Sequence, residues 1–132
     1  FNRFSKQLAI FEKDPALGLL GSSMYISNPR GLFNEVFFYP ESNESIKKAI
    51  FLYNPFVHGS IVIRKSVLDS LGGYNEAFRY VQDYELWSRV VQTTKSMNYQ
   101  LPLYARLRDS DCSEVVVDKT EYVAAIQKEL KK

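Results

Sequence analysis

The sequence has one cysteine, no long apolar run and no excess of charge of one sign. Because Cys112 has no second cysteine to pair with, no intramolecular disulfide can form. No run of about eighteen apolar residues is present, so no membrane-spanning helix is encoded here. Seventeen basic and fifteen acidic residues leave a formal charge of +2, and the two signs are interspersed. Nucleic acid is therefore not expected as a partner, since proteins that bind it usually carry a basic patch.

Apolar residues are plentiful, at 45% of the 132 residues, which is enough for one domain with a modest core. Their spacing predicts a single α/β domain over residues 1–132, with a small mixed sheet flanked by helices. Helices are expected up to Asp14, from Ser42 or Asn43 to Tyr53, from residue 64 to Gly72, from near Asp83 to about residue 91, and over 120–130. Strands are expected over 17–27, 35–39, 61–63, 97–100 and 103–108.

The stretch over residues 72–89 organises the chain. Gly72 and Gly73 form a helix stop, because glycine takes the left-handed conformation at little steric cost. A second helix then begins with Asp83 in its first turn, where free backbone N–H groups and the helix dipole favour a negative charge. Leu86, Trp87, Val90 and Val91 recur at helical spacing and predict its buried face.

These residues resemble a known family. Residues 72–78 read Gly-Gly-Tyr-Asn-Glu-Ala-Phe and residues 82–89 read Gln-Asp-Tyr-Glu-Leu-Trp-Ser-Arg. The pattern resembles the acceptor-side signature of inverting glycosyltransferase family 2, which has the GT-A fold. The resemblance implies that Asp83 is the catalytic base, and that Gly73, Tyr84 and Trp87 lie at the acceptor. Two simpler roles stay open, a helix cap for Asp83 and a core anchor for Trp87.

A second informative stretch is residues 54–60, Asn-Pro-Phe-Val-His-Gly-Ser, in which a proline and a glycine bracket His58 and indicate a loop. It resembles a family segment across the cleft from the base. His58 would then position the acceptor or contact the donor phosphate, or else only fix the loop. Near the C-terminus, Arg106 and Arg108 match positions near the donor diphosphate, although many relatives carry histidine where Arg108 stands. A surface charge is the other interpretation of Arg108.

The family's nucleotide-binding half, with the strand that ends in its Asp-x-Asp metal motif, has no counterpart here. Because residues 3–11 resemble the helix after that motif, we expect this chain to be the C-terminal, acceptor-side part of a longer enzyme. The resemblance implies a nucleotide-sugar donor, a glycan or lipid-linked acceptor, and Mn or Mg bound outside this chain. It also implies a cytoplasmic enzyme, or one peripheral at the inner face of the membrane, in cell-surface polysaccharide synthesis. The alternative is a non-catalytic interaction module, which would form a homodimer through the surface that the donor half would cover.

Overall fold

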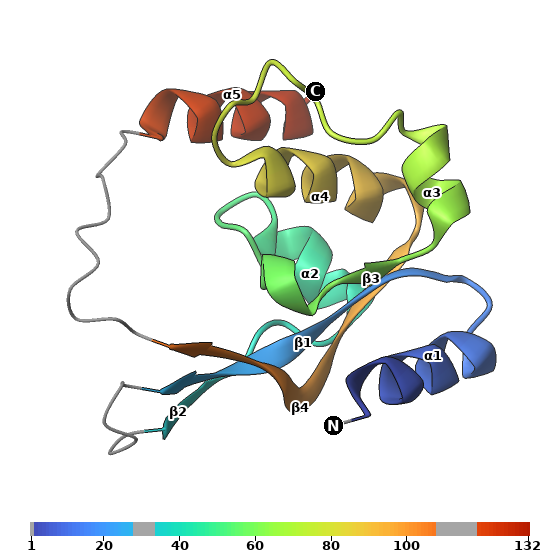
Figure 1. Cartoon of the computed structure of the whole chain (residues 1–132). Coiled ribbons are helices and arrows are strands. Elements are labelled where there is room, and N and C mark those ends of the chain that lie inside the picture. Colours follow the sequence, from blue (N-terminus) through green and yellow to red (C-terminus); the bar gives the residue numbers. More distant parts are fainter. Residues whose placement is uncertain (1, 28–33, 108–118) are drawn as a thin grey trace.

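The computed structural model describes residues 2–27, 34–107 and 119–132, which form a mixed α/β fold (Figure 1). Its elements in chain order are α1 (Arg3–Lys13), β1 (Leu17–Ser27), β2 (Asn34–Phe37), α2 (Asn43–Ala49), the 3₁₀ helix η1 (His58–Ser60), β3 (Val62–Ile63), α3 (Lys65–Ser70), α4 (Gln82–Thr93), β4 (Lys95–Leu107) and α5 (Thr120–Leu130). The expected small mixed sheet flanked by helices is confirmed. No helix in the described ranges is long and apolar enough to cross a membrane.

Strand β1 is the centre of the four-stranded sheet. Its first eight residues are buried, as expected for a strand covered on both faces. Strand β4 pairs with it in parallel along its whole length, while β3 and β2 pair antiparallel with its beginning and its end. Between these two short strands, the Ser22 N–H donates to Ser60 Oγ of η1 at 3.0 Å. The loop that carries η1 is thereby attached to the sheet edge.

The two faces of the sheet are covered by different helices. Helices α2, α4 and α5 lie on one side and α1 lies on the other (Figure 1). Leu19 belongs to the larger core beneath α2 and α4, whereas Leu17 and Leu20 pack with Phe11 of α1. Regular alternation would place Leu17 and Leu19 on one face, but the register shifts at Gly18 between them. The irregularity thus accounts for Leu17 lying on the same face as Leu20 rather than on that of Leu19.

Two expectations about the elements were wrong. The pair of short strands expected over 97–108 is one continuous strand, β4, which begins at Lys95. Its pairing with β1 continues past Pro102, and the register skips two β4 residues immediately before that proline, so a bulge accommodates it. Helix α2 ends at Ala49 rather than reaching Tyr53, whose side chain is exposed.

Candidate functional site

The glycine pair closes α3 as expected. Gly72 and Gly73 have φ values of 73° and 72°, in the left-handed region. The Gly73 N–H donates to Leu68 O and the Gly72 N–H to Asp69 O, which together form a Schellman motif. The guanidinium of Arg89 on α4 donates to Leu71 O at 2.7 Å and Gly73 O at 2.8 Å. The first residues of the loop between α3 and α4 are therefore held by a side chain of α4.

Asp83 is the second residue of α4 and is half-buried. The residue that precedes the helix is Val81, in a left-handed conformation with φ of 54°, and its side chain makes no capping hydrogen bond. Asn54 Nδ2 donates to Asp83 Oδ2 at 3.0 Å. The carboxylate is thus held by a distant loop rather than by the backbone of its own helix, which argues against a simple cap.

His58 and Tyr74 lie on the same side of the molecule as Asp83. The Tyr74 hydroxyl is 3.1 Å from His58 Nε2, and both side chains are exposed. Burial of part of the phenol raises the pKa of Tyr74, and the negative charge of Asp83 raises it further. A carboxylate, a phenol and an imidazole from three separate segments thus form one group at the surface.

The His58 loop is held by its surroundings. Arg3 Nη1 donates to Gly59 O at 2.6 Å, and Gln7 Nε2 donates to Ser60 O at 2.8 Å, both from α1. On the other side, a Cβ built on Gly59 would lie 2.4 Å from the ring of Tyr104 on β4. Only glycine therefore fits without displacing the ring. Arg3 and Gln7 thus fix this loop through its carbonyls, whereas the exposed His58 imidazole interacts with the Tyr74 hydroxyl.

Tyr84 and Trp87 were expected at the acceptor, and the structure places both in the core. Tyr84 is 3% exposed, and its hydroxyl donates to Ile50 O at 2.6 Å. Trp87 is 2% exposed and packs edge-on against Phe56 and His58, with ring centroids 6.2 and 6.1 Å apart. Neither side chain presents a surface to a ligand here, because α4 turns this face onto the sheet. Trp87 supports the loops of the site from below, as the core-anchor alternative requires.

The remaining expected residues are more dispersed. Gly73 contributes its carbonyl to Arg89, as described above. Arg106 is exposed near the end of β4, opposite Ile26 of β1. Burial raises the pKa of Tyr39, and the charge of Arg106 lowers it in part. Arg108 lies outside the described residues.

Metal ligands are not gathered within the described ranges, where no cluster of three or more histidine, cysteine, aspartate or glutamate side chains is found. The segment Asp109-Ser110-Asp111 has the letters of an Asp-x-Asp motif but lies outside those ranges.

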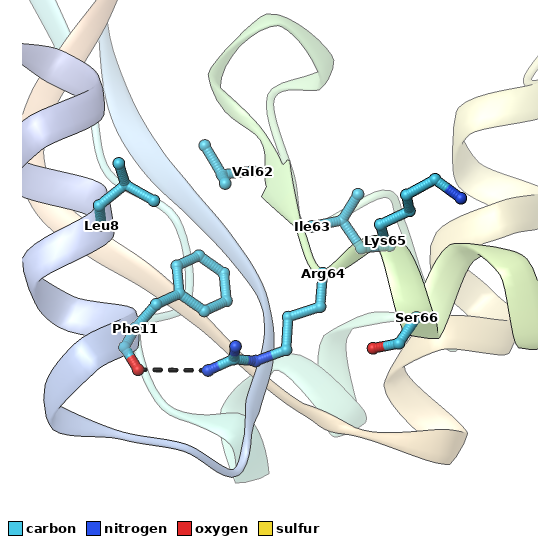
Figure 2. Close-up of a pocket in the computed structure, with 7 residues that line it drawn as sticks. All are labelled: Leu8, Phe11, Val62, Ile63, Arg64, Lys65 and Ser66. Carbon is cyan, nitrogen blue, oxygen red and sulfur yellow. Dashed lines mark hydrogen bonds between the residues drawn. The ribbon is translucent and has the colours of Figure 1, made fainter.

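A separate pocket of about 320 Å³ lies between α1 and the segment that joins β3 to α3 (Figure 2). Its lining is mostly apolar and consists of Leu8, Phe11, Val62, Ile63, Arg64, Lys65 and Ser66. The Arg64 guanidinium is directed at backbone carbonyls, with Nη2 3.2 Å from Phe11 O (Figure 2) and Nε 2.7 Å from Leu17 O. Asp83, His58 and Tyr74 do not line this pocket, so it is distinct from the candidate site.

Asn54 and Tyr74 were not expected as site residues. Asn54 lies in the stretch 54–60 and Tyr74 in the stretch 72–89. Their positions within these two motifs, rather than their residue types, could have indicated them as site residues. Only the fold shows that one contacts Asp83 and the other His58.

Comparison with known proteins does not decide the family. No protein-family model matches the chain, and no curated protein matches it significantly.

Proposed function

We propose that this chain forms the acceptor side of an inverting glycosyltransferase of GT-A fold, with Asp83 as the catalytic base. One observation supports the proposal above the others. Asp83 lies at the start of α4, next to a loop from a distant part of the chain, and Oδ1 accepts no hydrogen bond from the described residues. A catalytic base needs a free oxygen that can accept the proton of its substrate. A salt bridge to that oxygen would occupy it and make it unavailable.

The proposed reaction gives Asp83, His58 and Tyr74 separate roles. An oxygen of the acceptor hydroxyl forms a bond to the anomeric carbon while the bond from that carbon to the donor phosphate breaks. The electron pair of the broken bond leaves with the nucleoside diphosphate, and the hydroxyl proton passes to Asp83. His58 and Tyr74, both exposed beside this carboxylate, would orient the acceptor by hydrogen bonds.

The sugar donor must also be bound and its leaving group stabilised. An inverting transfer needs positive charge at the leaving diphosphate. A divalent ion would supply that charge, and the family resemblance implies that its ligands and the nucleotide pocket lie outside this chain. Arg106 and Arg108 are the candidates from this chain for the diphosphate, since a guanidinium offers a fork of donors to phosphate.

The exposed apolar surface supports a second candidate, an interaction module without catalytic activity. Phe4 and Leu8 of α1 are 61% and 54% exposed, and Phe38 after β2 and Leu107 at the end of β4 are 65% and 68% exposed. Such residues favour association with another copy or with a donor half.

The test is sugar transfer by the full-length protein with UDP and GDP sugars and manganese. Asp83→Asn should lower turnover by about a hundredfold or more while the donor still binds in calorimetry. Asp69→Asn is the matched control, because Asp69 is exposed on α3 and pairs with Lys65. Unchanged turnover of Asp83→Asn would disprove the base. Absence of donor binding and turnover in the wild type, together with self-association, would leave the interaction module.

A further inference from the structure

We infer that Asn54 is a positioning residue for the base, which holds Oδ2 of Asp83 so that Oδ1 faces the acceptor. This inference rests on the proposed function. Asn54 Nδ2 is 3.0 Å from Asp83 Oδ2, and the two residues are 29 positions apart in the chain. The orientation of the amide is determined on its other side, where Asn54 Oδ1 accepts from the Phe56 N–H at 3.2 Å. An amide in the opposite orientation would lose both hydrogen bonds.

The loop behind Asn54 is anchored to the sheet. Pro55 is fully buried, and its carbonyl accepts from Nδ2 of the buried Asn98 on β4 at 2.9 Å. The same Nδ2 also donates to Pro40 O at 2.8 Å. A Cβ on Gly21 of β1 would lie 2.2 Å from Asn98 Oδ1, so glycine provides the space for this amide. The sheet thus sets the position of Asn54 before any substrate binds.

A neutral donor suits this position chemically. A lysine or arginine would form a salt bridge and make the carboxylate a weaker base, whereas an amide orients it at a lower electrostatic cost. Among the described residues, Tyr74 lies close enough to be affected by the charge of Asp83, and its hydroxyl is 3.1 Å from His58 Nε2. Glu85, in the same first turn of α4, is bound to Arg89 instead. Loss of the Asn54 amide would remove a hydrogen bond that favours the charged carboxylate.

The sharpest variant is Asn54→Asp. It keeps an oxygen for the Phe56 N–H but replaces the donor by a second carboxylate. The acid limb of the pH profile of kcat should move upward by about one pH unit or more, because two adjacent carboxylates resist ionising together. KM for the donor should change little. Asn54→Ser, which also keeps an acceptor for the loop and is too short to reach Asp83, should move the limb in the same direction by less.

The control is Asn43→Ala. Asn43 is also half-buried and accepts from a backbone N–H, that of Ser96 at 2.9 Å, but it does not contact the site. It should lower the melting temperature and leave the pH profile in place. If Asp83→Asn is inactive and both Asn54 variants keep the wild-type profile, this inference is overturned and the proposed function stands. If Asp83→Asn is fully active, the proposed role of Asp83 as the base is refuted, and the inference about Asn54 falls with it.

Discussion

Two carboxylates lie two positions apart on α4 and have opposite surroundings. Glu85 is 7% exposed, and Arg89 binds both of its oxygens, at 2.7 and 2.8 Å. The same guanidinium also satisfies two backbone carbonyls at the end of α3. Asp83 is less buried and, among the residues that the structure describes, receives one hydrogen bond, from a neutral amide. A carboxylate whose two oxygens are both bound by a cation stabilises the fold, whereas one with a single neutral hydrogen-bond donor keeps an oxygen free to accept a proton.

The largest effect should come from breaking the compensated pair. Arg89→Ala leaves Glu85 buried without a counter-charge and also removes the donors that hold the α3 turn. We expect a loss of about 3 kcal/mol in the free energy of unfolding, at the lower end for buried pairs because Arg89 is partly exposed. Urea denaturation followed by circular dichroism measures this loss.

The matched control is the ion pair of Lys48 with Glu44 on α2. It has the same spacing, but its side chains are 76% and 80% exposed. Lys48→Ala should cost less than about 0.5 kcal/mol. An equal loss in both variants would show that burial does not distinguish the two pairs.

A smaller effect is expected at the turn that Arg89 holds. A Cβ on Gly73 meets nothing within 4 Å, so Gly73→Ala tests the left-handed backbone alone. We expect a loss of about 1–2 kcal/mol in the free energy of unfolding, from thermal or urea melts. Gly72→Ala, with the same φ and the same open space, should cost a similar amount. A stable Gly73→Ala protein would mean that the turn changes conformation at little cost.

A change in stability smaller than at the glycine pair is expected at the other carboxylate, Asp83. Asp83→Asn keeps the size of the side chain, and it should change the free energy of unfolding by less than about 1 kcal/mol. Because the charge of Asp83 helps to raise the pKa of Tyr74, this variant should deprotonate Tyr74 at lower pH than the wild type does. An ultraviolet pH titration, with Tyr74→Phe to assign the signal, measures the difference.

The sign follows from linkage. A phenol whose pKa is raised by folding contributes stability below its unfolded value of about 10, and that stability is lost as the pH rises through the folded value. Removal of the Asp83 charge should therefore weaken the alkaline loss. An unchanged Tyr74 titration would place Asp83 too far away to influence it.

Local patterns predicted much of the fold. The helical spacing of Leu86, Trp87, Val90 and Val91 predicted the buried face of α4, and all four residues are buried. The glycine pair predicted the end of α3, and the run of uncharged residues predicted β1. The prediction failed at β4, because Pro102 interrupts the local strand pattern. The neighbouring β1 supplies the hydrogen bonds that continue the strand, and no window of a few residues contains that partner.

The candidate site shows the same division. The sequence by itself determined the end of α3, the start of α4 and the acidic residue in its first turn, because glycine conformation and helical periodicity are local properties. Only the tertiary structure decided that Asn54 reaches Asp83, that Tyr74 reaches His58, and that Tyr84 and Trp87 belong to the core. Those contacts join residues far apart in the chain, so they depend on how the helices pack on the sheet rather than on any local preference.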